Sequence, residues 1–150
     1  MELYDAESLA RSLMDSHGLN HVPLEWHGRA RVFGTCTFNR VGCFGPWYVT
    51  AILLSKRLVA INSPEYVRDT ILHEIAHALV GPDADHGPLW KAKARELGCK
   101  DTGRCGANVT PIPGPYFAEC PCGIQHQFYR KPTRGKICRH CRSRLEIKAR

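Results

Sequence analysis

The 150-residue sequence lacks the features that mark membrane and secreted proteins. No run of apolar residues approaches the roughly 20 that a membrane-spanning helix requires. The opening Met-Glu-Leu-Tyr-Asp has neither the basic nor the apolar region of a signal peptide. Without such a leader, the eight cysteines favour metal thiolates over a disulfide scaffold. These absences predict a cytoplasmic protein that does not bind membranes.

The sequence also lacks any charge excess over most of its length. Residues 1–116 contain 12 Lys and Arg residues against 12 Asp and Glu residues. Residues 117–150 contain nine basic residues against Glu119 and Glu146, so they carry the whole net charge of +7. A localised basic segment indicates a polyanionic partner, and we expect DNA. The side chains expected to contact phosphates are Arg130, Lys131, Arg134 and Lys136.

Helix- and strand-breaking residues cluster between these two parts. Residues 111–116, Pro-Ile-Pro-Gly-Pro-Tyr, contain four glycines or prolines and predict a linker. We therefore predict a domain of residues 1–110, this linker, and a module of residues 117–150. A chain of this length can bury one modest core together with a small appended module.

The first domain has the sequence pattern of an α+β fold. Amphipathic spacing predicts helices over residues 5–17 and 88–97. Segments rich in β-branched and aromatic residues predict strands over 26–37 and 48–54, and a third short strand over 58–62. Strands followed by a packed helix favour an α+β domain over an array of parallel βαβ units.

The most informative segment is residues 70–79, which contains the pattern His-Glu-x-x-His. Side chains four residues apart lie on the same face of a helix, so His73 and His77 can bind one metal ion. Glu74 is placed to activate a water molecule as a general base, and not to bind the metal.

The flanking residues predict that this segment is helical. Ser63-Pro64 is typical of a helix start, and Gly81-Pro82 is typical of a helix end. Apolar residues recur between them at helical spacing and predict a buried stripe. These residues are Val67, Ile71, Ile75, Ala78 and Leu79.

Two histidines leave the metal site incomplete, because a catalytic zinc normally has three protein ligands. We favour His86, which follows His77 by nine residues on a loop that can fold back over the metal. Val80 occupies the glycine position of the longer metzincin motif, which argues against that class. The alternatives that remain open are Glu96, as in thermolysin-like enzymes, and Asp83 or Asp85.

The residues around these histidines resemble one known family. Residues 71–78, Ile-Leu-His-Glu-Ile-Ala-His-Ala, and 86–91, His-Gly-Pro-Leu-Trp-Lys, are similar to the SprT-like zinc metalloproteases. This family includes the Spartan proteases, which digest proteins crosslinked to DNA. Residues 33–36 and 52–55 also resemble its strand segments, so the likeness covers nearly the whole chain. The compact size is similar to that of versions carried by bacteriophages.

The resemblance implies a zincin-like metalloprotease domain. It implies that His73, His77 and His86 bind one catalytic zinc ion and that Glu74 is the general base. The expected protein is a monomeric zinc endopeptidase that acts on DNA-associated proteins, with an exposed strand near residues 48–54 aligning the substrate. An alternative is a nucleic-acid-binding zinc protein whose helix site is structural or inactive, although Glu74 argues against it. A weaker alternative is a hydrolase of a non-peptide amide.

The basic module contains two close cysteine pairs. Cys120 with Cys122 and Cys138 with Cys141 are separated by fifteen residues, which indicates a zinc ribbon around one structural zinc ion. SprT-like proteins often carry a ribbon here, which supports the interpretation. The first pair has one intervening residue where the usual knuckle has two. This leaves open that His126 or His140 replaces one thiolate.

The ribbon is expected to contain short strands at residues 128–129 and 145–147, with a hairpin turn at 132–135. So small a module buries little apolar surface, so the metal is expected to supply most of its stability. Four cysteines remain, and free thiols are favoured over a further metal site. They are Cys36, Cys43, Cys99 and Cys105.

Overall fold

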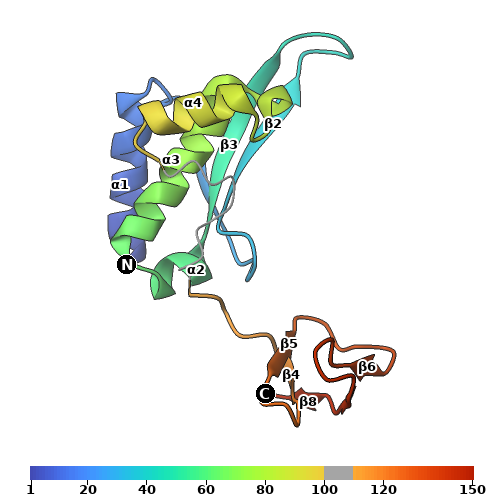
Figure 1. Ribbon diagram of the computed structural model, residues 1–150. Coiled ribbons are helices and arrows are strands. Elements are labelled where there is room, and N and C mark those ends of the chain that lie inside the picture. The colour runs from blue at the N-terminus through green and yellow to red at the C-terminus, as the bar shows by residue number, and fades with distance from the viewer. Residues whose placement is uncertain (100–109) are drawn as a thin grey trace. The chain divides into compact units, whose positions relative to one another are not determined.

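The computed structural model describes residues 1–99 and 110–150, which form two compact units, Met1–Pro111 and Ile112–Arg150. Figure 1 shows helices in the first unit and only short strands in the second. In the described part of the chain, no helix is both long and apolar enough to cross a membrane. Each unit is built around its own buried residues.

The first unit contains a sheet of three strands in the order β1-β3-β2. Strand β3 (Trp47–Ser55) is central and confirms the strand predicted over 48–54. It pairs in parallel with β1 (Leu24–His27) and antiparallel with β2 (Gly34–Arg40). The single strand predicted over 26–37 is therefore wrong. The chain must leave β1 and cross to the opposite edge of β3, and residues 28–33 make that crossing.

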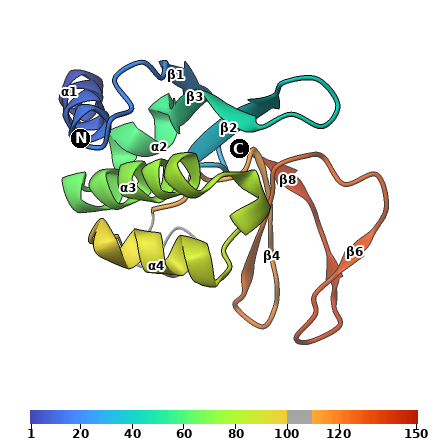
Figure 2. The same cartoon turned by 90° about the horizontal axis from the view of Figure 1, so that it is seen from above.

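Helices pack beside this sheet. Figure 2 shows α3 (Pro64–Val80) running between the sheet and α4 (Pro88–Glu96). Helix α1 (Leu3–Ser16) also contacts α3. Helices α1, α3 and α4 confirm the three helices predicted from the sequence. The mixture of helices and strands in this unit fits an α+β domain.

The short strand predicted over 58–62 is wrong, because these residues form most of helix α2 (Lys56–Ile61). The Ser55 hydroxyl accepts a hydrogen bond from the Leu58 N–H at 3.3 Å, which caps the first turn. Leu58 and Val59 are buried. An apolar segment of one turn is too short for its hydrophobic periodicity to distinguish a helix from a strand. Here the Ser55 cap stabilises the helix.

Helix α3 begins at Pro64, and the Ser63 side chain makes no capping hydrogen bond. Val67, Ile71 and Ile75 are fully buried, as the apolar stripe predicted. Leu79, however, is 39% exposed, because the last turn of α3 borders a half-open groove.

Gly81 ends α3 with φ of 84°, a backbone conformation that favours glycine. Its N–H donates to the His77 carbonyl at 2.9 Å. The chain then turns through the 3-10 helix η1 (Pro82–Ala84) before α4 begins.

The second unit contains two small sheets. One has the strand order β5-β4-β8, and the other pairs β6 with β7. The strands are β4 (Tyr116–Glu119), β5 (Gln125–Phe128), β6 (Lys136–Ile137), β7 (Arg144–Leu145) and β8 (Lys148–Ala149).

The hairpin turn predicted at residues 132–135 is wrong, because the strands on either side of it, β5 and β6, belong to different sheets. The strands also differ from those predicted at 128–129 and 145–147. The reason is that each cysteine pair occupies its own turn, one between β4 and β5 and the other between β6 and β7. The metal-ligand turns therefore define the hairpins of this unit.

Residues 112–116, expected to belong to a linker, are hydrogen-bonded within the second unit. The Tyr129 hydroxyl donates to the Ile112 carbonyl at 2.6 Å, and the Gly114 N–H donates to Oε1 of Gln127 at 3.1 Å. The core of this unit is small, and its buried members are Ala118, Cys120, Cys138 and Leu145.

Candidate metal centres

Three histidines of the first unit converge on one point. The Nε2 atoms of His73 and His77 lie 3.3 Å apart, and the Nε2 atom of His86 lies 3.2 and 3.1 Å from them. Tetrahedral zinc with bonds of about 2.0–2.1 Å holds its nitrogen ligands about 3.3–3.4 Å apart. The observed triangle therefore fits three ligands of a single zinc ion.

Local structure explains the convergence. His73 and His77 lie one turn apart on α3, and the helix ends at Val80, three residues after His77. The turn through η1 then brings His86, just before α4, back to the metal-facing side of α3. The alternative ligand Glu96 is exposed and pairs with Lys93 Nζ at 2.6 Å, while Asp83 accepts from Trp47 Nε1 at 3.1 Å.

Asp85, another alternative ligand, supports His86 instead. Its Oδ1 lies 3.2 Å from His86 Nδ1, on the opposite side of the ring from the metal-facing Nε2. A carboxylate in this position holds the proton on Nδ1 and leaves Nε2 free to bind a metal. Asp85 has φ of 41°, an uncommon conformation for a non-glycine residue that aspartate tolerates better than most.

Trp90 packs against all three histidines. Its ring centroid lies 4.6 Å from those of His73 and His86 and 5.2 Å from that of His77. The side chain is fully buried. Sequence reasoning treated this residue only as part of the family resemblance. The only feature of the sequence that indicated its place in the metal site is its position on α4, four residues after His86.

Burial makes these histidines suitable ligands. Burial, together with the neighbouring histidines, lowers the pKa of His73 to about 3. Burial and His86 lower the pKa of His77 to about 4, although Asp85 acts in the opposite direction. Both imidazoles are therefore neutral near pH 7 and can offer a lone pair to a metal.

Glu74 lies on α3 beside the triangle and is only 6% exposed. Burial raises its pKa to about 8, although a hydrogen bond from the Cys36 N–H acts in the opposite direction. A bound divalent cation would lower this pKa. Glu74 is outside the group of ligand atoms, as expected of a base that binds no metal.

Strand β2 lies directly against Glu74. A Cβ atom on Gly34 would come within 2.7 Å of Glu74 Oε1 and 2.9 Å of Thr70 Cγ2, so any larger residue there would displace these side chains. The Cys36 N–H donates to the Glu74 carboxylate. The backbone of β2 therefore fixes where this carboxylate lies.

Residues 48–54, expected to align a substrate, lie on the central strand β3, of which residues 52–55 pair on both edges; β2 lies at the edge of this sheet in the described part of the chain. The Ser55 N–H donates to the Phe33 carbonyl and the Val41 N–H donates to the Pro46 carbonyl. Because backbone directions alternate along a strand, even-numbered residues of β2 point their N–H and C=O groups outward. That outer edge runs past Glu74.

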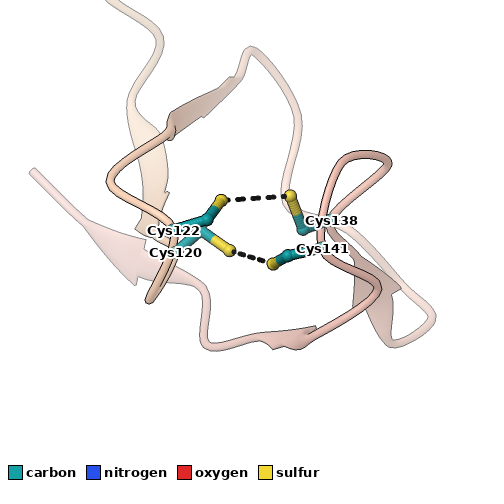
Figure 3. Close-up of side chains that lie close together, drawn as sticks. All are labelled: Cys120, Cys122, Cys138 and Cys141. Carbon is teal, nitrogen blue, oxygen red and sulfur yellow. Dashed lines mark hydrogen bonds between the residues drawn. The ribbon is translucent and has the colours of Figure 1, made fainter.

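The second unit brings its four cysteines together, as Figure 3 shows. All four sulfur atoms lie within 4.8 Å of one another. The Sγ atoms of Cys122 and Cys138 are 3.8 Å apart, and the Sγ atoms of Cys120 and Cys141 are 3.1 Å apart. Tetrahedral zinc with Zn–S bonds of about 2.3 Å separates its sulfur ligands by about 3.8 Å. The first distance matches this value and the second is shorter.

The one-residue spacing of the first pair does not prevent convergence. The Cys120 N–H closes the turn by donating to the Ile124 carbonyl at 3.0 Å. Gly123 adopts φ of 82° within the same turn. His126 and His140 are not in the sulfur cluster and line a cavity of about 470 Å³ beside Cys138. Hydrogen bonding with Ser143 is the largest of several effects that lower the pKa of the Cys141 thiol to about 6, which favours the thiolate that metals bind.

The other cysteines lie apart from both clusters. Cys36 is half-buried and Cys43 is exposed, whereas Cys99 is buried with Sγ 3.5 Å from the Asp69 carbonyl. Cys105 lies outside the described residues. In the part of the chain that the structure describes, the three histidines and the four ribbon cysteines are the groups that can hold a metal.

The basic residues predicted to contact DNA are all exposed. Arg130, Lys131 and Arg134 lie in the segment that joins the two small sheets, and Lys136 begins β6. Their charges are therefore available to a polyanion.

Comparison with known proteins identifies the first unit. A model of the SprT-like family matches residues 5–111. The chain belongs to the SprT-like family. It is 32% identical over 110 residues to Protein SprT of Glaesserella parasuis serovar 5 (strain SH0165), covering 65% of this chain and 70% of that protein.

A second relative of this SprT-like chain is Protein SprT of Proteus mirabilis (strain HI4320). The two are 32% identical over 111 residues, which is 64% of this chain and 65% of the relative. The chain thus spans about two thirds of the length of these relatives. The family match contains His73, His77, His86 and Glu74, and ends where the basic unit begins.

Proposed function

We propose that the first unit is a zincin-like zinc endopeptidase domain of the SprT-like family. The observation that carries this proposal is the triangle of three Nε2 atoms with a buried carboxylate next to it on the same helix. A site that serves structure alone normally has four protein ligands and needs no such carboxylate. The geometry therefore supports catalysis over a structural role.

The residues divide the reaction between them. His73, His77 and His86 would hold a zinc ion, which would supply a Lewis acid for the substrate carbonyl and lower the pKa of water. Glu74 takes a proton from the attacking water and gives it to the leaving amine. Asp85 holds His86 in the tautomer that binds metal, and Gly34 and Cys36 hold Glu74 in place. The outer edge of β2 aligns an extended substrate through backbone hydrogen bonds.

We also propose that the second unit is a zinc ribbon that binds DNA. Its four thiols suit one structural zinc ion, and its basic side chains are exposed. Such a unit would hold the protease on DNA, so that DNA-associated proteins are its substrates. Location, more than a narrow sequence preference, would then select what is cleaved.

The test is proteolysis by the purified zinc-loaded chain. Casein and histones are incubated with it, with and without DNA, and with a chelator as the control. We expect zinc-dependent cleavage, and faster cleavage of histones when DNA is present. Two zinc ions per chain with DNA binding and no cleavage of any protein would instead support a nucleic-acid-binding protein with an inactive helix site.

A further inference from the structure

An open groove lies next to the candidate active site. It has a volume of about 310 Å³ and lies between the sheet and the end of α3. Phe38, Trp47 and Val49 form the wall from the sheet, and residues 78–83 form the wall from the helix and the following turn. None of these side chains has a place in the reaction described above.

Apolar side chains form part of the groove lining, beside backbone and carboxylate oxygen atoms, and the wall that carries Trp47 is held in place. Trp47 is 40% exposed and Leu79 is 39% exposed, so both present apolar surface that a bound side chain can cover. The Trp47 ring is fixed from two directions. Its Nε1–H donates to Asp83 at 3.1 Å, and the Arg40 guanidinium lies 4.8 Å from its centroid.

The groove is continuous with the substrate-aligning edge. Phe38 lines the groove, and its backbone N–H and C=O groups are on the outer edge of β2. It lies two positions after Cys36, whose N–H donates to Glu74. Two residues of a strand span about 6.6–6.8 Å. On the helix side, residue 78 follows the ligand His77 directly, and Asp83 precedes His86 by three residues.

We infer that this groove is a specificity subsite that binds one bulky apolar side chain, aromatic or aliphatic, of the polypeptide substrate. This inference rests on the proposed peptidase function. A substrate strand on β2 places alternate side chains on the same face, so one of them enters the groove at a fixed distance of about two residues from the scissile bond. Its neighbours point away and are unselected.

The expected preference follows from the burial of that side chain. Hydrophobic pockets discriminate between side chains by about 10–200-fold. A half-open groove belongs at the lower end of that range. We expect about tenfold, which corresponds to about 1.4 kcal/mol.

The experiment uses the full zinc-loaded chain and two readouts. Fluorogenic peptides carry Phe, Leu, Gly or Asp at each position in turn on an otherwise Gly/Ala-rich background, and kcat/KM and the cleavage sites are measured. The same peptides are then bound to Glu74→Gln, and their Kd values are measured by fluorescence anisotropy. The second readout does not require hydrolysis.

Leu79→Glu places a charge in the groove, and Ile61→Glu is the matched control. Ile61 is similarly exposed, at 45%, but lies on α2 and does not line the groove. We expect Phe and Leu at one fixed position to be favoured about tenfold over Gly. Leu79→Glu should abolish this preference and Ile61→Glu should retain it. Zinc content and thermal unfolding of each variant verify the fold.

The outcomes separate the two proposals. Selective binding that depends on Leu79, without any hydrolysis, would support the groove and overturn the peptidase function. Cleavage and binding with no preference at any position would overturn the groove and leave the peptidase standing. A preference that survives Leu79→Glu would place the subsite elsewhere and would also overturn this inference.

Discussion

At the scale of single residues, Glu74 differs from His73 and His77 because it is proposed to act as the general base and not to bind the metal. Its carboxylate accepts from the Cys36 N–H and stays outside the histidine triangle. Glu74→Gln keeps the size of the side chain and removes the base. We expect peptide hydrolysis to fall by about 10²–10⁴-fold with one zinc ion still in the histidine site. Proteolysis assays with metal analysis measure both, and loss of that zinc would contradict the assignment.

Asp85 offers a second test at this scale, because it acts through His86. Asp85→Ala removes the carboxylate from His86 Nδ1, and loss of such a partner typically weakens metal affinity by about 10–100-fold. Titration with a competing chelator measures the change. Asp85→Asn keeps an acceptor and should lose less. Glu96→Ala, which breaks only an exposed pair with Lys93, should leave zinc affinity unchanged. An effect of Glu96→Ala instead would favour the thermolysin-like ligand set.

At the scale of secondary-structure elements, the contact of β2 with α3 determines where the base lies. Gly34→Ala would place a methyl group 2.7 Å from Glu74 Oε1. We expect a stability loss of about 1–3 kcal/mol and a larger proportional loss of kcat than of zinc affinity. Chemical denaturation and peptide assays measure these effects.

Gly28→Ala is the matched control for that substitution. No atom lies within 4 Å of a Cβ built on Gly28, and its backbone is not in the left-handed region. It should change neither stability nor activity measurably. Equal behaviour of the two variants would show that β2 does not constrain Glu74.

The β4–β5 and β6–β7 hairpins give a prediction about metal removal. Two of the four buried residues in the core cluster of the second unit are cysteines, so little apolar burial remains without a metal. We expect chelation to unfold residues 112–150, because metal binding supplies the folding free energy of such modules. Limited trypsin digestion should then cut first at the basic residues of this unit. Unchanged protection after removal of all zinc would contradict this expectation.

At the scale of the whole molecule, charge separates the two units. All of the net charge of +7 lies in residues 117–150. DNA binding through phosphate contacts releases counterions, so its affinity falls steeply with salt. We expect the full chain to bind DNA with strong salt dependence and residues 1–111 to bind weakly. Anisotropy titrations at several salt concentrations measure both, and equal affinities at low salt would contradict a role for the basic unit.

The sequence by itself determined the parts of this protein that depend on local spacing. His73 and His77 face the same way because a helix repeats every 3.6 residues, and the same argument separates Glu74 from the ligands. Cysteine pairs identify a ribbon for a similar reason, since each pair lies within one turn of the chain. Family resemblance indicated His86, which spacing alone left among several alternatives.

Only the tertiary structure decided the parts that depend on contacts between distant segments. Strand pairing separated β1 from β2, and β2, not β3, lies against Glu74. The packing of α4 brought Trp90 under the three histidines, and the turn after Gly81 directed Asp85 to support His86. These relations join residues that local periodicity cannot connect, because they arise from how elements pack and not from how each one forms.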